Sequence, residues 1–317
     1  MKHKIFVDGQ KGTTGLMIHE RLANHPYVEC LTIDYDKRRD LETRKKLLNE
    51  ADIAILCLPD EAAKESVSLI SDSNTRVLDA STAHRINDDW VYGIPELNKS
   101  QREKIKKAKR VANPGCHATG FIMSVAPLVS EGIIPRDYPI SFHSITGYSG
   151  GGKNMIKKYE DENEGTDYYK VPRHYALEMH HKHLPEMTKY SGLTYEPLFT
   201  PIVCNYYKGM VVTLPLIKRK LGNNVTAKDI YNFLKEHYKE ESFVSIYSSE
   251  YDFDKLHYDG GFVIEGCNDT NNIEICVYGN EEQILLMSRF DNLGKGASGA
   301  AIQNMNIMLG IDETIGL

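Results

Sequence analysis

The amino-acid sequence predicts an α/β protein in which a doubly wound parallel sheet is joined to an α+β second domain with a mostly antiparallel sheet. Three observations support this fold class. The first part of the chain alternates short apolar runs with helical patterns, which is typical of a parallel sheet. The second part is rich in β-type runs separated by turns. The 317 residues exceed the size at which one core usually keeps growing, so we expect two domains.

In the first part, strands and helices are expected in strict alternation. The apolar runs that predict buried strands are 5–7, 31–33, 53–58 and 77–78. The patterns that predict helices are 16–22, a charged stretch that ends at residue 48, and 62–70. Because consecutive parallel strands are joined by right-handed crossovers, this order predicts one parallel sheet with helices on both faces.

The second part changes to β-rich runs with only one or two helices expected between them. These runs are 138–145, 196–204, 210–217, 243–246, 262–264, 273–277 and 283–289. The stretch 297–309 returns to helical spacing, and a terminal helix of this kind is expected to pack back on the first domain. We therefore predict one domain from residues 1–117 with 296–317, and a second from residues 118–295.

Composition and charge exclude several classes of protein. With 41% hydrophobic and 26% charged residues the chain is of ordinary globular type, and no run of about 20 apolar residues predicts a membrane span. The net charge of -6 gives no reason to expect a nucleic-acid partner. The basic run 102–110 and the acidic run 160–167 are interpreted as solvated surfaces. The N-terminus turns polar after three apolar residues, so it predicts a strand, not a signal peptide, and a cytoplasmic location.

Six cysteines show neither a Cys-x-x-Cys pair nor the spacing of a zinc site, so no disulfide and no metal are expected. Cys30, Cys57, Cys204 and Cys276 lie in or beside apolar stretches and are interpreted as core residues, while Cys267 is left open.

Cys116 differs from the other cysteines because it follows the turn-forming pair Pro114-Gly115 and precedes a helical apolar run. This arrangement places a thiol near a helix N-terminus, where unpaired backbone N–H groups and the helix dipole favour the nucleophilic thiolate. Cys116 is therefore the candidate nucleophile. The alternative is a small, buried apolar cysteine.

A glycine-rich loop follows the first expected strand and leads into a helix. Its residues are Gly9, Gln10, Lys11, Gly12, Thr13, Thr14 and Gly15. Glycines in this context let the backbone turn sharply and approach a pyrophosphate, while the helix N-terminus faces the anion. The spacing is GxxGxxG, not the commoner GxGxxG, and a purely structural glycine turn is the alternative.

Residues 34–39 carry signals for both nicotinamide dinucleotides. Asp34 and Asp36 at the expected end of the second strand would bind the ribose hydroxyls of NAD, whereas Lys37, Arg38 and Arg39 would pair with the 2'-phosphate of NADP. Three adjacent cations favour NADP(H), with Arg38 as the contact.

Three histidines within four positions, His180, His181 and His183, could supply a partner for the thiol. Pro185 cannot lie inside a helix, so the histidines are expected just before a helix that starts near it. A metal-binding pair without an evident third ligand and a solvated polar cluster are the alternatives.

The chain contains six motifs, which are GxxGTTG at 9–15, DASTAHR at 79–85, NPGCHATG at 113–120, GYSGGGK at 147–153, HKHLPE at 181–186 and DNLGKGASGAAIQNMN at 291–306. Together they resemble the motifs of the N-acetyl-gamma-glutamyl-phosphate reductase family, in its shorter type 2 form, within the aspartate-semialdehyde dehydrogenase superfamily. Their order is that of the family and they span nearly the whole chain. The resemblance implies a Rossmann-type dinucleotide domain and an α+β domain that also forms the oligomer interface.

The resemblance also implies roles for individual residues. Cys116 matches the nucleophile and His181 the acid–base residue, while His183 and Glu186 match residues that shape the substrate pocket. Arg85 matches an arginine that faces the acyl phosphate. On the substrate side we also expect Asn113, Ser149, Gly150 and Lys208, although a flexible loop is the alternative at residues 150–152. On the cofactor side we expect Ser81 and Thr82 near the phosphates, Asn292 and Lys295 near the nicotinamide, and Leu58 and Pro59.

Two positions depart from the family pattern. His117-Ala118 stands where many relatives have Tyr-Pro, which leaves open whether His181, His183 or His117 is the base. Lys208-Gly209 stands where the long form has Arg-Gly, and lysine lacks the bidentate fork of arginine.

The implied activity is NADPH-dependent reduction of N-acetylglutamyl phosphate to the semialdehyde through a cysteine thioester, in arginine biosynthesis, by a homodimer or homotetramer. Aspartate-semialdehyde dehydrogenase and a reductase of a carrier-linked acyl phosphate are the alternatives. A thiol hydrolase and a non-catalytic NADP sensor are the alternatives from other classes.

Overall fold

The computed structural model describes residues 2–71, 74–161, 166–248, 250 and 252–317. Residues 162–165 of the acidic run 160–167 lie outside the described residues. The chain divides into two compact units, one formed by Met1–Gly115 with Ala297–Leu317 and the other by Cys116–Gly296. The boundaries expected from the sequence were 117/118 and 295/296. In the structure the first change of unit falls at the Gly115–Cys116 peptide bond, so the thiol belongs to the second unit.

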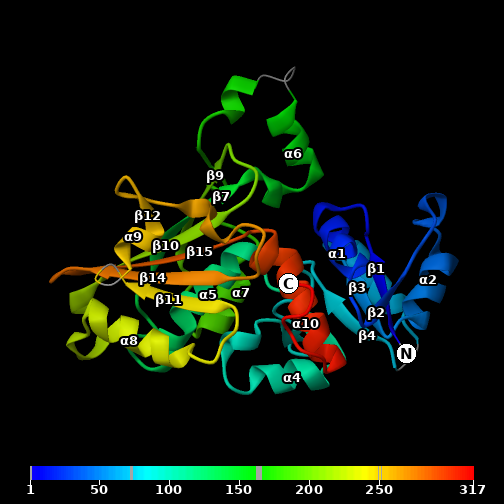
Figure 1. The fold of residues 1–317 in the computed structure, drawn as a ribbon, viewed down its shortest axis with the longest axis horizontal. Helices are drawn as coiled ribbons and strands as arrows, with labels where there is room; N and C mark the ends of the chain where they lie inside the picture. The colour runs from blue at the N-terminus through cyan, green and yellow to red at the C-terminus, as the bar shows by residue number, and fades with distance from the viewer. Residues whose placement is uncertain (1, 72–73, 162–165, 249, 251) are drawn as a thin grey trace. The chain divides into compact units, whose positions relative to one another are not determined.

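The first unit contains a parallel sheet with helices between its strands (Figure 1). Its strands are β1 (His3–Asp8), β2 (Val28–Leu31), β3 (Ile53–Leu56), β4 (Arg76–Asp79), β5 (Val91–Tyr92) and β6 (Arg110–Ala112). Its helices are α1 (Thr13–Ala23), α2 (Leu41–Glu50), α3 (Asp60–Leu69), α4 (Gln101–Lys107) and α10 (Gly299–Leu309). The predicted strand at 31–33 is misplaced: β2 lies at Val28–Leu31, and the residues after it lead into the 3-10 turn Tyr35–Lys37.

Among the described residues the strand order is β2-β1-β3-β4-β6-β5, and every pair is parallel. The chain leaves β1 toward β2 on one side and then adds β3 on the other side of β1. The carboxyl ends of β1 and β3 therefore flank a topological switch point, the place where open α/β sheets bind their ligands. The doubly wound parallel sheet that the sequence predicts is confirmed.

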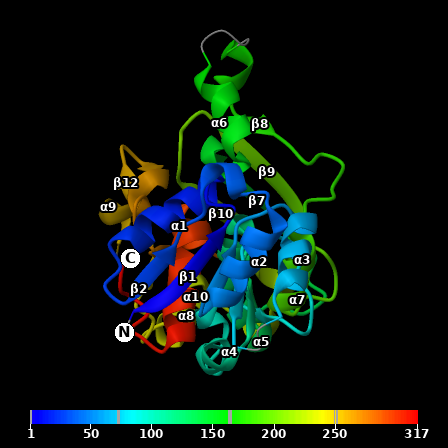
Figure 2. The same cartoon turned by 90° about the vertical axis from the view of Figure 1, so that its right-hand side faces the viewer.

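Helices cover both faces of this sheet. One apolar core joins β1, β3 and β4 to α1, α4 and α10 through residues such as Val7, Ile18 and Met305. The other joins the same strands to α2 and α3 through Phe6, Leu48 and Ala63. Figure 2 shows α1 on one side of β1 and α2 and α3 on the other. The terminal helix α10 is thus part of the first unit, as expected from its apolar spacing.

The second unit contains a mixed, mostly antiparallel sheet. Its strands are β7 (Ser141–Gly147), β8 (Arg173–His174), β9 (Leu198–Cys204), β10 (Met210–Ile217), β11 (Val244–Ser248), β14 (Ile273–Gly279) and β15 (Gln283–Phe290), with a separate hairpin of β12 (His257–Tyr258) and β13 (Gly261–Phe262). Its helices are α5 (Cys116–Ser130), α6 (Lys153–Glu160), α7 (Leu184–Ser191), α8 (Ala227–His237) and α9 (Phe253–Leu256).

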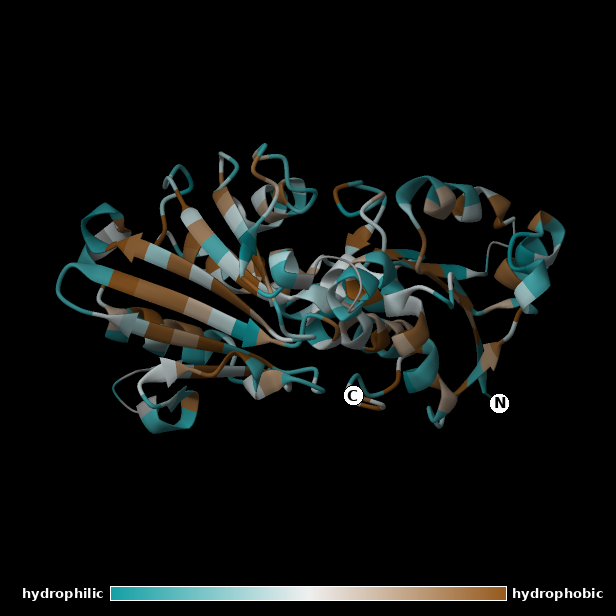
Figure 3. Cartoon of the chain, turned by 90° about the horizontal axis from the view of Figure 1, so that it is seen from above, coloured by the Kyte–Doolittle hydropathy of each residue, from teal (hydrophilic) through white to brown (hydrophobic). Residues whose placement is uncertain are grey.

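In the described residues the order is β11-β14-β15-β10-β7-β9-β8, with parallel pairs only between β11 and β14 and between β7 and β9. The predicted sheet type is confirmed, but the expectation of only one or two helices between the strands is wrong, since α6, α7, α8 and α9 all follow β7. Figure 3 shows hydrophobic and hydrophilic residues alternating along strands of this sheet.

Helix α5 packs directly on the middle of this sheet because Gly120 carries no side chain. A Cβ at Gly120 would lie 2.6 Å from a ring carbon of Phe290 and 2.8 Å from both Ser288 Oγ and a methyl group of Val212. The Ser288 hydroxyl donates to the Gly120 carbonyl over 3.2 Å. This close approach fixes where the first residue of α5, Cys116, lies relative to β15 and β10.

Of the helices in the described part of the chain, none is both long and apolar enough to cross a bilayer.

Candidate active site

Cys116 is the first residue of α5, where the sequence predicted it, and its side chain is half-buried. The backbone of Gly296 lies against it, because a Cβ at Gly296 would come within 2.9 Å of the Cys116 Cβ. Gly296 belongs to a π-helical segment, Gly294–Ser298, and such segments are common at functional sites. A glycine at position 296 is therefore required for the turn to reach the thiol.

The three imidazoles of His117, His181 and His183 form one cluster, and His117 directly follows Cys116 in the chain. The ring of His181 lies 5.2 Å from that of His117 and 4.7 Å from that of His183, edge to face in both cases. Pro185 is in the first turn of α7, so the histidines precede the helix as predicted. The backbone N–H of His183 donates to His181 Nδ1 over 3.2 Å, which places the proton of the neutral His181 ring on Nε2.

His117 is buried and both of its ring nitrogens are engaged. Nδ1 lies 2.8 Å from the Ser144 hydroxyl and Nε2 lies 2.8 Å from the Tyr175 hydroxyl. Burial lowers the pKa of His117 well below its usual value, and the nearby His181 and Lys182 act in the same direction. The ring is therefore neutral and is not available as a base. Sequence reasoning missed Ser144 and Tyr175, because nothing in their neighbourhood in the chain links them to Cys116.

The predicted substrate loop is tied to the sheet through Asn292. The Asn292 amide donates to Ser149 Oγ over 3.0 Å and accepts from the Gly209 backbone N–H over 2.8 Å. A Cβ added at Gly150 would lie 3.3 Å from the nitrogen of the same amide. Asn292 is 1% exposed, so in this structure it holds two loops together.

Two lysines that were predicted to be site residues also contact other side chains of the protein. Lys208 forms an ion pair with Asp269, whose backbone N–H donates to Asp291 Oδ2 over 2.9 Å. Lys295 is buried, and its ammonium lies 5.5 Å from the centre of the Phe243 ring. The contact of Lys208 with substrate and that of Lys295 with the nicotinamide stay predictions.

In the first unit, the glycine-rich loop adopts the conformation that its glycines permit. Gly9 has φ +94°, and a Cβ there would lie 2.3 Å from the Cys57 carbonyl oxygen; a Cβ at Gly15 would lie 2.3 Å from the Gly9 carbonyl oxygen. At Gly12, in contrast, the nearest atoms are 3.5 Å away. Gly9 and Gly15 are thus required by the fold, whereas Gly12 leaves open space, as a loop that admits a pyrophosphate needs.

The residues of this loop fit a dinucleotide phosphate. Helix α1 begins at Thr13 with no capping side chain and no acidic residue in its first turn, so its positive end is not neutralised there. The Thr13 hydroxyl is buried and finds no hydrogen-bond partner among the described residues. Leu58 lies 3.1 Å from the Cβ position of Gly9, which brings the end of β3 to the loop. Gln10 donates to the Leu31 carbonyl over 3.3 Å.

A buried ion pair that sequence reasoning missed supports the start of the loop. Arg44 Nη2 donates to Asp8 Oδ2 over 3.1 Å and to Ser66 Oγ over 2.7 Å, and the Ser66 hydroxyl donates to the same carboxylate over 2.9 Å. Asp8 is the last residue of β1, so the pair joins the strand directly before Gly9 to α2 and α3. The signal in the sequence was a charged residue at the end of an apolar strand.

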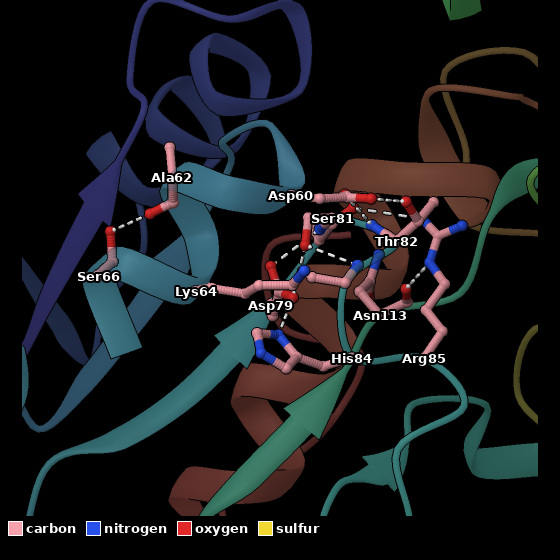
Figure 4. Close-up of polar contacts among 12 residues, drawn as sticks. Asp60, Ala62, Lys64, Ser66, Asp79, Ser81, Thr82, His84, Arg85 and Asn113 are labelled. Atoms are coloured by element: carbon pink, nitrogen blue, oxygen red, sulfur yellow. Dashed lines mark hydrogen bonds and ion pairs between the residues drawn. The ribbon is translucent and has the colours of Figure 1, made fainter. Parts of the chain in front are cut away.

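The DASTAHR segment forms a hydrogen-bonded turn after β4 (Figure 4). Asp79 accepts from the backbone N–H and hydroxyl of Ser81 over 2.9 and 2.7 Å and lies 2.7 Å from His84 Nδ1. The Thr82 hydroxyl donates to Asp60 at the start of α3 over 2.5 Å. Ser81 and Thr82 thus line the carboxyl ends of β3 and β4, next to Pro59.

Arg85 and Asn113 hold backbone in place. Arg85 is buried and donates to the carbonyl of Asn113 over 3.0 Å and to that of Ala80 over 3.2 Å. The Asn113 amide donates to the Ala297 carbonyl over 3.0 Å and accepts from Asn304 over 3.1 Å. Both residues therefore shape the segment that leads to Cys116, and their contact with substrate stays a prediction.

Arg38 folds over its own turn. Its guanidinium lies 3.6 Å from the centre of the Tyr35 ring and donates to the Tyr35 carbonyl over 2.6 Å. Arg39 and Asp34 are exposed.

All six cysteines are free thiols. Cys276 and Cys267 are buried, whereas Cys30, Cys57 and Cys204 are only half-buried. Cys30 and Cys57 pack against a core of the first unit. Burial raises the pKa of Cys57, Cys267 and Cys276 to about 12 and that of Cys30 to about 11. Among the described residues, no group of three or more His, Cys, Asp or Glu side chains could hold a metal ion.

Comparison with known proteins decides the family. Residues 4–108 match the NAD binding domain of semialdehyde dehydrogenases and residues 116–292 match their dimerisation domain. An N-acetyl-gamma-glutamyl-phosphate reductase of Nostoc sp. is 46% identical over 100% of this chain and 99% of its own length. The chain belongs to the N-acetyl-gamma-glutamyl-phosphate reductase family. A further family member from Chelativorans sp. is 45% identical over 98% of this chain and 99% of its own length.

The fold of this family member is also that of solved semialdehyde dehydrogenases. Aspartate semialdehyde dehydrogenase II of Vibrio cholerae, complexed with ASA, superposes with a TM-score of 0.72 at 12% identity and covers 98% of this chain and 99% of its own. The enzyme of Francisella tularensis gives 0.71 at 13% identity, over 98% of this chain and 100% of its own. At these identities the likeness to the solved structures shows the fold alone. The resemblance to the reductase family that the motifs indicated is confirmed by the two relatives from Nostoc sp. and Chelativorans sp..

Proposed function

We propose that this protein reduces N-acetylglutamyl phosphate to N-acetylglutamate semialdehyde, with NADPH as the reductant, in arginine biosynthesis. The observation that carries the proposal is Cys116 at the first position of α5, with the His181–His183 pair in the same unit and the Gly296 turn against its Cβ. The two relatives that support it are reductases of this name at 45–46% identity over nearly their whole length.

Cys116 would act as the nucleophile. Its thiolate forms a bond to the acyl carbon while the bond from that carbon to the phosphate oxygen breaks, which leaves a thioester on the sulfur and releases phosphate. The backbone N–H groups at the start of α5 would donate to the reacting oxygen and stabilise its negative charge in the tetrahedral states. The helix dipole favours the thiolate over the thiol at the same position.

His181 would handle the protons. It takes the thiol proton before attack. After reduction of the thioester, the oxygen of the tetrahedral hemithioacetal re-forms a carbonyl as the bond from carbon to sulfur breaks, and His181 returns its proton to the leaving sulfur, so that the semialdehyde is released. Its Nδ1 now accepts from the His183 N–H, so this contact has to open when the ring takes up a second proton. His117 is neutral and fully engaged, which favours His181 for this role.

The glycine-rich loop with Thr13, Ser81 and Thr82 would hold the dinucleotide, which supplies the hydride when bound. For the preference between the two dinucleotides, Arg38 and Arg39 favour NADP(H). Replacing both with Ala is expected to raise the KM for NADPH at least about tenfold, the cost of a lost charged contact, and to change the KM for NADH little. Equal changes in the KM for NADPH and for NADH would contradict the assignment of Arg38 and Arg39 to NADP(H) binding.

The assembly is proposed to be a homodimer through the uncovered face of the second sheet. Val212, Ser288 and Phe290 face α5, so the alternating residues Leu285 and Met287 of β15 point to the other face, where they are only partly buried. A second copy would cover them, which fits the dimerisation domain that the chain matches. Met287→Glu is expected to lower the mass in sedimentation to that of one chain. Unchanged mass would place the interface elsewhere.

A cytoplasmic location belongs to the same proposal, because the thiol has to stay reduced.

The deciding assay runs the reaction backward. With N-acetylglutamate semialdehyde and NADP, the protein should produce NADPH only when phosphate is present, since phosphate has to cleave the thioester. Aspartate semialdehyde as the substrate is the matched control and should react far more slowly. Preference for aspartate semialdehyde would favour the sister dehydrogenase, and NADP binding without any turnover would favour a sensor.

A further inference from the structure

A chain of hydrogen bonds runs through the buried imidazole that follows the nucleophile. Ser144 on β7, His117 on α5 and Tyr175, just after β8, are joined by two contacts of 2.8 Å on opposite ring nitrogens. Ser144 is fully buried and His117 is 3% exposed. All three residues belong to the second unit, which also contains Cys116. The proposed reaction does not use this chain.

The backbone around Tyr175 is held in an unusual conformation. Its N–H donates to the Pro201 carbonyl of β9 over 3.3 Å. Directly afterward, Ala176 and Met179 have φ values of 52° and 62°, and the Met179 N–H closes the turn on the Ala176 carbonyl over 3.1 Å. Left-handed non-glycine residues cost about 1 kcal/mol or more each, and they persist where the surroundings demand them, commonly at functional sites. This turn carries the chain from Tyr175 to His181.

The phenol of Tyr175 lies beside the imidazoles of His117 and His181. Its ring is 5.9 Å from that of His181. Burial raises the pKa of Tyr175 well above its usual range, and the negative charge of Cys116 raises it further, so the hydroxyl stays protonated beside the thiolate. An un-ionised phenol next to a thiolate is a hydrogen-bond donor.

We propose that Tyr175 donates a hydrogen bond to the sulfur of Cys116 and that His117 and Ser144 are the positioning residues that aim it. Ser144 donates to His117 Nδ1, which fixes the ring proton on Nε2; Nε2–H then donates to the Tyr175 oxygen, and the phenol O–H is left for the thiolate. No proton is transferred along the chain. The inference rests on the proposed role of Cys116 as the nucleophile, and it gives His117 a function other than that of a base.

Several other titratable or charged groups belong to the elements around the thiol. His181 and Lys182 act on the pKa of His117, and the His183 ring lies 5.6 Å from that of His117. Glu186 follows in α7, and Lys295 directly precedes Gly296, whose backbone lies against Cys116. None of these is changed in the variants below, so their contribution is the same in every comparison.

The test follows the reactivity of the thiol without any substrate. Iodoacetamide alkylation of the peptide that contains Cys116 is measured by mass spectrometry across a range of pH. Tyr175→Phe is expected to slow alkylation near neutral pH about three- to tenfold and to move its midpoint to higher pH, because one neutral hydrogen bond to the thiolate is lost. His117→Gln is expected to give the same shift, and Ser144→Ala a smaller one in the same direction.

The double variant Tyr175→Phe/His117→Gln should be no slower than either single variant, since both remove the same hydrogen bond. Tyr195→Phe, at an exposed tyrosine, is the matched control and should behave as the unchanged protein. An unchanged midpoint in both single variants, or additive losses in the double variant, would overturn the proposal. A merely structural role would lower the fraction of folded protein without moving the midpoint.

The result is separate from the fate of the proposed function. If the phosphate-dependent assay fails while the alkylation midpoint shifts, the reductase activity is wrong and the hydrogen-bond chain stands. If the assay succeeds and the midpoint does not move, only the inference about Tyr175 is wrong.

Discussion

The imidazoles of His117 and His181 are neighbours with opposite surroundings. His117 is almost fully buried between Ser144 and Tyr175, so protonating it would remove the acceptor that Nδ1 offers to Ser144 and would place a charge in a buried site. His181 is half-buried, and the nitrogen it would protonate accepts a backbone N–H over 3.2 Å. A proton can therefore reach His181 at lower cost than His117, which is what acid–base catalysis requires.

This difference predicts the effect of His181→Asn. Turnover should fall about 10²- to 10⁴-fold, the usual contribution of a general acid–base group, and the near-neutral limb of the pH–rate profile should disappear. Steady-state kinetics across pH would measure both. His180→Asn, at the exposed first histidine of the segment, is the control. A profile that kept its near-neutral limb in the His181 variant but lost it in His183→Asn would exchange the two roles.

At the scale of residues, motif and chemistry predicted Cys116, the cluster of histidines and the glycine loop, because each is marked by neighbours in the chain. The tethering of Asn113, Asn292 and Lys208 could not be predicted in the same way. Their partners lie far along the chain, at Asn304, Ser149 and Asp269, and become neighbours only in the folded sheet.

Helix α5 depends on one small residue for its position. Gly120→Ala would place a methyl group against Phe290, Ser288 and Val212 at 2.6–2.8 Å, so the helix or the sheet must shift. We expect the free energy of unfolding to fall by about 1–3 kcal/mol, the usual cost of overpacking. Chemical denaturation would measure it.

The matched control is Gly261→Ala in the β12–β13 hairpin, where the nearest atom to a new Cβ is 3.5 Å away. If both variants lost the same stability, the close packing of α5 on β15 and β10 would not be what restricts position 120.

The elements that the sequence predicted best are the long apolar ones. Strand β10 was placed without error at Met210–Ile217, since its apolar run is long and bounded by turns. Helix α8 was missed although Thr226 and Asp229 form a capping box at its start, a signal that could have found it. Helix α6 is eight residues long and none of them is buried, so its few apolar side chains form too short a pattern to recognise. The expected strand at 262–264 is reduced to the two-residue β13, because its chain turns into a 3-10 helix at Ile264.

At the scale of the whole molecule, buried neutral histidines connect folding to pH. Burial is the main cause that lowers the pKa of His117, His25 and His143. In the unfolded chain such groups take up protons near pH 6.5, whereas the folded chain keeps them neutral to lower pH. The unfolded state then binds more protons, so stability is present above about pH 6.5 and is lost as the pH falls below it.

We therefore expect the free energy of unfolding to decrease between about pH 6.5 and 5, by up to about 1.4 kcal/mol per pH unit for each such histidine. Denaturation at several pH values measures this slope. His117→Gln should reduce the slope, while His180→Gln, at an exposed position, should not. A slope that is unchanged in the His117 variant would mean that this ring is charged in the folded protein.

The most direct measurement traps the acyl group on the enzyme. The protein is mixed with N-acetylglutamyl phosphate in the absence of a reductant and digested under mildly acidic conditions, and the peptides are weighed by mass spectrometry. The account predicts an N-acetylglutamyl adduct on the peptide that contains Cys116, none in Cys116→Ser, and its disappearance when NADPH is added. An adduct on another residue, or full turnover by the serine variant, would contradict the account.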